Sequence, residues 1–135
     1  GRNVRDWIFV DDHNDGTILA FEKGRAGEVY NLGARCEKRN IDLVKLLIEK
    51  LKACLKDKKD FKEPEIAFVK DRPGHDFRYA IDPSKAESEL GFKPKISFEE
   101  GIDLTVKWYI ENEGWWRRII SGEYLEYVEK QYGGK

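Results

Sequence analysis

The residues of this sequence best suited to chemistry are two arginines and a histidine from distant segments. Arg5 opens an apolar segment, and Arg72 and His75 belong to the turn Asp-Arg-Pro-Gly-His-Asp at 71–76. Guanidinium groups match phosphate oxygens two at a time, and charged hydrogen bonds contribute roughly 1.5 to 3 kcal/mol each. Two such groups on one site would neutralise a diphosphate, so the sequence raises the hypothesis of a site for that anion.

A structural role is the competing interpretation for each residue taken singly. Pro73 and Gly74 fix a tight turn, on which Arg72 would pair with a carboxylate at a gain below about 1 kcal/mol. Arg5 is followed directly by an acidic residue and has the same option. Asn40 could donate a hydrogen bond to a ligand, but a helix-capping role already accounts for it. Residue chemistry alone favours the structural role, and the diphosphate hypothesis stays open.

Self-contained catalytic sets and metal sites are absent from the sequence. It has no Gly-x-x-x-x-Gly-Lys loop, no glycine-rich dinucleotide turn, no His-Glu-x-x-His and no Gly-x-Ser-x-Gly. His13 is interpreted as a surface or helix-capping residue, and no spacing supplies it with partners for a metal. Cys36 and Cys54 cannot form a disulfide framework or a zinc quartet. We therefore expect no catalytic, cofactor-binding or metal-ligating residue in this chain.

Composition predicts a globular protein without nucleic-acid or membrane partners. The 135 residues include 25 basic and 26 acidic side chains, for a net charge of -1, and 40% are hydrophobic. Such a balance gives no general attraction to nucleic acid or anionic lipid. Because no apolar run could span a bilayer and no signal peptide opens the chain, a cytoplasmic location is expected. The absence of methionine indicates a processed chain or a part of a longer protein.

The elements that must position these residues alternate loosely between strands and helices, which predicts an α/β fold, mixed α+β as an isolated piece. Strands are predicted at 5–10, 28–32 and 66–69. Helices are predicted from 11 or 12 to about 23, from a cap at Asn40 to about 54, from 82–83 to 91, from a capping box at 97–100 to about 110, and over 124–132.

Five segments carry a resemblance to a known family. They are 4–13 (Val-Arg-Asp-Trp-Ile-Phe-Val-Asp-Asp-His), 27–33 (Gly-Glu-Val-Tyr-Asn-Leu-Gly), 37–40 (Glu-Lys-Arg-Asn), 71–82 (Asp-Arg-Pro-Gly-His-Asp-Phe-Arg-Tyr-Ala-Ile-Asp) and 89–94 (Glu-Leu-Gly-Phe-Lys-Pro). In order and spacing they resemble the C-terminal part of dTDP-glucose 4,6-dehydratases, nucleotide-sugar enzymes of the extended short-chain dehydrogenase/reductase family. The segment 4–13 is shared broadly among such enzymes, whereas 71–82 points to the 4,6-dehydratases.

The resemblance implies that the partner is a nucleotide-diphosphate sugar, dTDP-glucose. It implies a substrate-binding set along the diphosphate: Arg5, Asn40, Asp71, Arg72, Pro73, Gly74 and His75, the last five forming one wall. The family reaction uses NAD to oxidise the sugar at C4, eliminates water across C5 and C6, and returns the hydride to C6, giving dTDP-4-keto-6-deoxyglucose. For the parent enzyme the resemblance implies a homodimer.

The same resemblance implies that the catalytic machinery lies elsewhere. The NAD-binding Rossmann half, the Tyr-x-x-x-Lys pair and the Asp-Glu pair of the family are missing from these residues. We expect the chain alone to bind no NAD and to be inactive. Residues 1–33 would form a strand-helix-strand segment that packs on the absent Rossmann sheet, and 34–135 a mostly helical substrate-binding domain. Alone, 1–33 would expose apolar faces and self-associate or be partly disordered.

Two other functions remain open. A stand-alone nucleotide-sugar binding module or sensor without catalysis would bind dTDP at micromolar strength, whereas a part that needs its missing half would bind it weakly. A purely structural domain would tolerate Arg72→Ala in the full-length protein with unchanged diphosphate affinity. The binding hypothesis instead expects that variant to lose roughly 10- to 100-fold in affinity.

Overall fold

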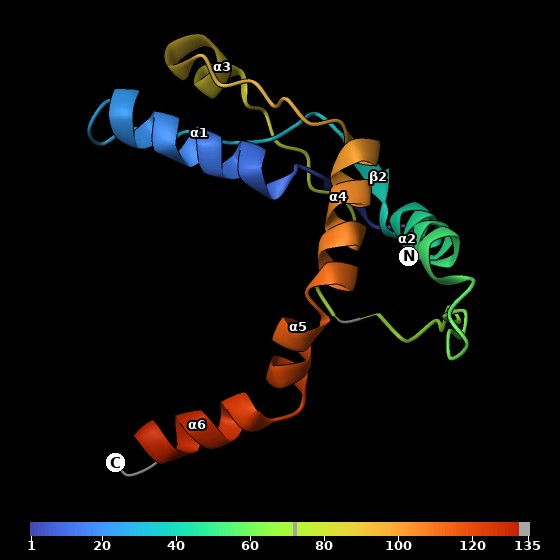
Figure 1. The fold of residues 1–135 in the computed structure, drawn as a ribbon. Helices are drawn as coiled ribbons and strands as arrows, with labels where there is room; N and C mark the ends of the chain where they lie inside the picture. The colour runs from blue at the N-terminus through green and yellow to red at the C-terminus, as the bar shows by residue number, and fades with distance from the viewer. Residues whose placement is uncertain (72, 133–135) are drawn as a thin grey trace. The chain divides into compact units, whose positions relative to one another are not determined.

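The computed structural model describes residues 1–71 and 73–132, apart from five side chains in the last helix. The chain divides into two compact units, Gly1–Ile102 and Asp103–Lys135. Along it lie β1 (Val4–Asp6), α1 (Val10–Lys23), β2 (Glu37–Arg39), α2 (Asn40–Leu55), α3 (Ser84–Leu90), α4 (Phe98–Glu111), α5 (Glu113–Ile120) and α6 (Glu123–Tyr132) (Figure 1). The described chain is thus mostly helical with a small two-stranded sheet, which confirms the predicted mixed fold in part.

Strand β1 lies between two segments that are distant in the sequence. It pairs antiparallel with β2 along its whole length, with Arg5 opposite Lys38. On its other side, Val4 donates its N–H to the Phe77 carbonyl (2.8 Å) and accepts at its own carbonyl from the Tyr79 N–H (3.0 Å). This pairing brings the chain that follows the 71–76 turn directly beside Arg5.

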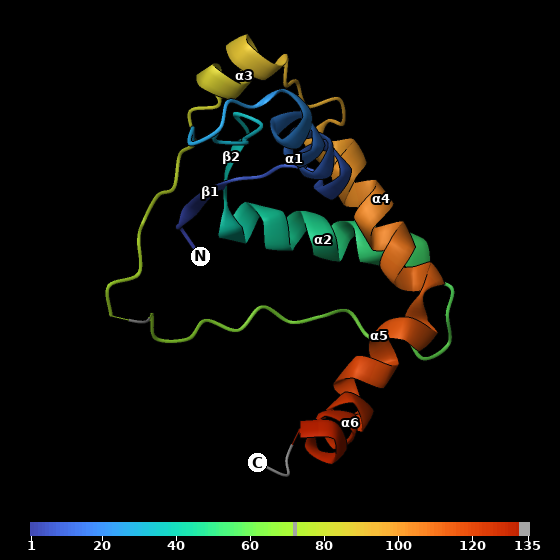
Figure 2. The same cartoon turned by 90° about the vertical axis from the view of Figure 1, so that its left-hand side faces the viewer.

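Three strand predictions are corrected by the structure. The strand predicted at 5–10 is only Val4–Asp6, because α1 begins at Val10. The segments 28–32 and 66–69 belong to no strand, and 66–69 lies in the long connection between α2 and α3 (Figure 2). A strand requires a neighbouring ladder for its backbone groups, and within the described residues neither segment has one.

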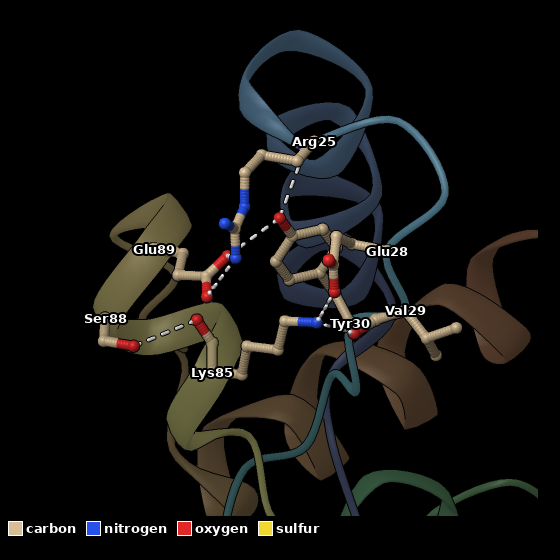
Figure 3. A network of polar contacts seen from close by, with 7 residues as sticks. All are labelled: Arg25, Glu28, Val29, Tyr30, Lys85, Ser88 and Glu89. Atoms are coloured by element: carbon tan, nitrogen blue, oxygen red, sulfur yellow. Dashed lines mark hydrogen bonds and ion pairs between the residues drawn. The ribbon is translucent and has the colours of Figure 1, made fainter.

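Side-chain contacts hold the 25–30 segment against α3 instead (Figure 3). Arg25 Nη2 lies 2.9 and 3.0 Å from the two carboxylate oxygens of Glu89, and the Tyr30 hydroxyl donates to the same group at 3.0 Å. Lys85 Nζ donates to Glu28 at 2.6 Å and lies 4.8 Å from the centre of the Tyr30 ring. The predicted strand is therefore a connecting segment fixed by an ion-pair network on α3.

The predicted helices are present, with changes at their ends. α2 begins at Asn40, so the capping position falls on Arg39, which makes no side-chain capping bond, and the predicted cap at Asn40 is wrong. α3 begins at Ser84 and not at the predicted 82–83, so Pro83 is the capping residue, and Asp82 Oδ1 accepts the Ser84 N–H at 3.0 Å. It ends at Gly91, whose φ of 71° is left-handed. Within the described residues, no helix combines the length and apolar character that a membrane crossing needs.

The buried face of α2 is also shifted from the predicted stripe. We expected Val44, Leu47, Ile48, Leu51 and Cys54 to share it. Leu43 is the buried residue of the helix, while Val44 is 38% exposed and Cys54 is exposed. The other three residues of the predicted stripe, Leu47, Ile48 and Leu51, are partly buried.

The core of the first unit forms where α1 and α3 lie side by side (Figure 1). Ala86, Leu90 and Phe92 are buried, with exposed fractions of 0, 2 and 3%. Around them pack the partly buried residues Ile8, Leu19, Ala20, Tyr30 and Leu32. Burying a side chain of the size of leucine or phenylalanine contributes roughly 1.5 to 3 kcal/mol, so this cluster stabilises the contact between the two helices.

Gly16 lies inside α1 because the helix approaches this core closely. A Cβ at Gly16 would lie 2.8 Å from Phe92 Cε2 and 2.9 Å from both Leu32 methyl carbons. We expect Gly16→Val to destabilise the full-length protein by about 1 to 3 kcal/mol through overpacking, measured as a lower thermal midpoint. Gly114→Val is the matched control, because no atom beyond its chain neighbours and its own helix backbone lies within 4 Å of the corresponding Cβ. Equal midpoints for the two variants would contradict this packing.

The second unit contains a cluster of aromatic side chains. The Trp108 ring contacts those of Tyr109 and Trp115 edge to face, with 5.2 Å between ring centres in each pair. Trp116 Nε1 donates to the Tyr109 carbonyl at 2.8 Å. These contacts fix the start of α5 on the end of α4. The amphipathic stretch predicted at 124–132 is helix α6.

Candidate functional site

Arg5 and the turn at 71–76 come together in the structure. Arg5 Nη2 lies 2.9 Å from His75 Nε2 and 3.1 Å from the backbone carbonyl of Asp76. Its other terminal nitrogen, Nη1, donates to the Val4 carbonyl at 2.7 Å. The parallel pairing of β1 with the segment that follows the turn produces this contact. Two of the residues singled out in the sequence thus share one polar cluster.

The hydrogen bonds of His75 determine where its ring proton lies. A guanidinium only donates, so His75 Nε2 accepts from Arg5 and carries no proton. The proton is then on Nδ1, which lies 2.7 Å from Asp71 Oδ1 and donates to that carboxylate. His75 thus connects Asp71 to Arg5. Its ring orientation is set from both sides.

Asn40 lies next to this cluster through the backbone of Asn3. The Asn40 N–H donates to the Asn3 carbonyl at 2.9 Å. Since Asn40 is not a helix cap, the structural role that we had expected does not occupy its side chain. Its Oδ1 is buried and has no hydrogen-bond partner among the residues that the structure describes.

The rest of the predicted wall is described only in part. Pro73 and Gly74 form a turn and are exposed, and Gly74 has a left-handed φ of 69°, which favours glycine. Arg72 lies outside the described residues. The geometry therefore gives the relation of Arg5 to Asp71 and His75, while the role of Arg72 stays a prediction.

Asn3, Asp76 and Tyr79 belong to the cluster and were missed in the sequence. Asn3 is buried, with 8% exposed, and its Nδ2 donates to the Asp76 carbonyl at 3.3 Å. The Tyr79 ring centre lies 4.5 Å from Arg5 Cζ, and its hydroxyl donates to the Asp76 carboxylate. Asp76 and Tyr79 fall within the segment 71–82 that carries the resemblance, which is the signal that could have identified them.

An ion pair between Arg78 and Glu37 also links segments of this sheet. Arg78 donates from Nε and Nη2 to the two carboxylate oxygens of Glu37, at 2.6 and 2.7 Å. The pair joins β2 to the segment that follows the turn and so spans β1. The hydrogen bonds from Arg78 lower the pKa of Glu37 below its ordinary 4.5.

We expect acid to weaken this fold as its paired carboxylates protonate. Hydrogen bonds from neighbouring side chains lower the pKa of five of them: Glu28, Glu37, Asp42, Asp82 and Glu87. A lowered folded-state pKa gives stability that is present above the ordinary values of 4.5 for Glu and 3.8 for Asp, and is lost as the pH falls through the folded pKa. The measurement is the thermal midpoint from pH 6 to about pH 3. Glu37→Gln should reduce the fall of the thermal midpoint at acid pH. An unreduced fall would contradict the stabilising role of the Glu37 carboxylate.

Metal-binding clusters are not found in the described part of the chain. No group of three or more His, Cys, Asp or Glu residues there is arranged to hold an ion. His13 is exposed, as expected for a surface residue. Burial raises the pKa of the Cys36 thiol above 9.0, which makes it a poor nucleophile at neutral pH.

Comparison with known proteins shows the family. The family model described as GDP-mannose 4,6 dehydratase matches residues 1–105. The dTDP-glucose 4,6-dehydratase of Escherichia coli is 43% identical over 135 residues, which are 100% of this chain and 37% of that protein. A probable dTDP-glucose 4,6-dehydratase of Sinorhizobium fredii is 48% identical over 96% of this chain and 38% of its own length. The chain therefore spans well under half the length of these relatives.

Solved structures agree with these relatives. The dTDP-glucose 4,6-dehydratase of Bacillus anthracis in complex with NAD is 45% identical, with a TM-score of 0.72 over 87% of this chain and 34% of that one. DesIV of Streptomyces venezuelae, a dTDP-glucose 4,6-dehydratase with NAD and TYD bound, is 43% identical, with a TM-score of 0.73 over 85% of this chain and 33% of that one. These findings confirm the resemblance seen in the sequence, and the chain belongs to the GDP-mannose 4,6-dehydratase family of extended short-chain dehydrogenases/reductases.

Proposed function

We propose that this chain is the nucleotide-sugar-binding part of an NAD-dependent dTDP-glucose 4,6-dehydratase. The observation that carries the proposal is the contact between Arg5 and the turn at 71–76, which places a guanidinium beside the segment that the resemblance assigns to the diphosphate. The relative DesIV, 43% identical to this chain, has NAD and TYD bound. A nucleotide diphosphate is an anion that the guanidinium of Arg5 can bind through charged hydrogen bonds.

Arg5 keeps hydrogen-bonding capacity for such a ligand. Of its five N–H donors, its contacts with the described residues use three: one to Val4, one to His75 and one to Asp76. The two that remain, on Nε and Nη1, would donate to phosphate oxygens. His75 holds the guanidinium in place from the side of the turn. Asn40 completes the proposed set, because its unpartnered Oδ1 can accept from a hydroxyl of the ligand.

The residues of this chain do not fit NAD by themselves. The strands of the described sheet are antiparallel, whereas a dinucleotide fold needs parallel strands joined through a helix. The sequence also has no Gly-x-Gly-x-x-Gly turn for the pyrophosphate of the cofactor. We therefore assign NAD binding and the chemical steps to residues outside this chain and derive no step through the cofactor here.

Turnover of dTDP-glucose by the full-length protein tests the proposed function. We expect the sugar nucleotide to lose one water, detected by mass spectrometry, and the 135-residue chain alone to give no product. Absence of water loss from dTDP-glucose with folded full-length protein would contradict the proposal. Micromolar binding of dTDP by the chain alone, without turnover by the longer protein, would favour the stand-alone binding module.

We further propose that residues 1–33 pack on a Rossmann sheet formed outside this chain. Apolar side chains of this segment are highly exposed: Val10 at 61%, Ile18 at 54%, Phe21 at 92% and Val29 at 76%. Exposed apolar surface of this kind drives association. The homodimer and the cytoplasmic location of the parent enzyme stay predictions.

We expect the 135-residue chain to self-associate when it is produced alone. The measurement is its molar mass by light scattering across a concentration series. Phe21→Gln, at the most exposed of these positions, should reduce the association. A monodisperse monomer with protected amides across residues 7–32 would count against the packing proposed for 1–33.

A further inference from the structure

Tyr79 contacts the guanidinium of Arg5 in two ways, one through its ring and one through its hydroxyl. The ring centre lies 4.5 Å from Arg5 Cζ, within the range of a cation–π contact. The hydroxyl donates to the carboxylate of Asp76, and the backbone carbonyl of Asp76 accepts from Arg5 Nη2 at 3.1 Å. Arg5 thus contacts the Tyr79 ring. It also contacts Asp76, the residue to which the Tyr79 hydroxyl donates.

The backbone fixes Tyr79 in register with Arg5. The Tyr79 N–H donates to the Val4 carbonyl at 3.0 Å, and that carbonyl also accepts from Arg5 Nη1 at 2.7 Å. Because one oxygen takes both bonds, movement of the Tyr79 segment would move an acceptor of the guanidinium. The aromatic ring cannot be explained as core packing, since Tyr79 is 49% exposed.

We propose that Tyr79 is a positioning residue that holds Arg5 in its diphosphate-binding orientation, an inference that rests on the proposed function. An arginine side chain has many rotamers, and restricting them in advance reduces the entropy lost when a ligand binds. The ring and the tie to Asp76 restrict Arg5 in addition to its contact with His75. The two donors left on Nε and Nη1 are then aimed before the ligand arrives.

A double-mutant cycle on dTDP affinity in the full-length protein, measured by calorimetry, tests this role. Tyr79→Leu should weaken dTDP binding about 3- to 10-fold, the range of a partly exposed cation–π contact. In an Arg5→Ala background the same change should have no further effect, because the residue that Tyr79 positions is gone. Tyr79→Phe keeps the ring and should lose less than about 3-fold. If Tyr79→Leu does not fold, the cycle with Tyr79→Phe takes its place.

The controls separate this inference from the proposed function. Phe77→Leu changes another exposed aromatic residue of the same segment, 63% exposed, and should leave dTDP affinity unchanged. An equal loss from Tyr79→Leu with and without Arg5 would show a general structural role and overturn the inference. Unchanged affinity in Tyr79→Leu, with a loss in Arg5→Ala, would overturn it as well and leave the proposed function standing. Unchanged affinity in Arg5→Ala would remove the proposed function itself.

Discussion

Replacing Arg5 by alanine weakens dTDP binding by the full-length protein about 10- to 100-fold, if charged hydrogen bonds to the diphosphate contribute roughly 1.5 to 3 kcal/mol. The effect is large because the change removes the donors on Nε and Nη1 together with the positive charge. It also leaves His75 Nε2 without the group that donates to it. The measurement is the dTDP dissociation constant from calorimetric titration at fixed salt concentration.

Arg35→Ala is the matched control for this prediction. Arg35 is another partly exposed arginine of the first unit, but it donates to Glu87 and to the Ser84 hydroxyl on α3. Its removal should leave dTDP affinity unchanged. Arg5→Lys keeps a charge without the planar fork and should fall between wild type and Arg5→Ala. Equal affinities for wild type and Arg5→Ala would mean that Arg5 has only a structural role.

Replacing Asp12 by alanine has the largest expected effect on stability. Asp12 is 3% exposed, and its carboxylate accepts the backbone N–H groups of Lys95 and Ile96 at 3.0 and 2.9 Å. Alanine would leave both donors without this acceptor. Such a loss destabilises a structure by about 2 to 3 kcal/mol. We therefore expect amide hydrogen exchange at Lys95 and Ile96 to accelerate about 30- to 150-fold.

The neighbouring acid serves as the control for this change. Asp11 is also in the first turn of α1, but it is exposed. Asp11→Ala should leave the exchange of the two amides within about 2-fold of wild type. Similar exchange rates in Asp12→Ala and Asp11→Ala would show that the buried carboxylate does not hold the segment at 95–96.

Except for α5, which the sequence did not predict, the helices of this fold could be predicted because their signals are local. The ends of α3 show this, since Asp82, Pro83 and Gly91 each act within one helical turn of their own position. The strand at 28–32 could not be predicted in the same way. Its composition suits a strand, but strand formation depends on a partner ladder, and in the described structure the segment is fixed to α3 by Glu28 and Tyr30.

For the candidate site, the residues themselves could be identified from local sequence, but the contacts between distant residues could not. The sequence singled out Arg5 and His75 by residue type and resemblance, but not their contact, which depends on β1 pairing with the segment 77–79. Tyr79 was missed because its role follows only from that register. The helix-cap interpretation of Asn40 was wrong by one residue, since β2 continues to Arg39 and the helix starts directly after it.

Determining the structure of the full-length protein with dTDP bound tests the central claim most directly. We predict an Arg5 guanidinium nitrogen at hydrogen-bond distance, about 2.7 to 3.2 Å, from a diphosphate oxygen, with the Tyr79 ring still in contact with the guanidinium. A diphosphate bound away from Arg5 and the 71–76 turn, with Arg5 still donating only to Val4, His75 and Asp76, would contradict it.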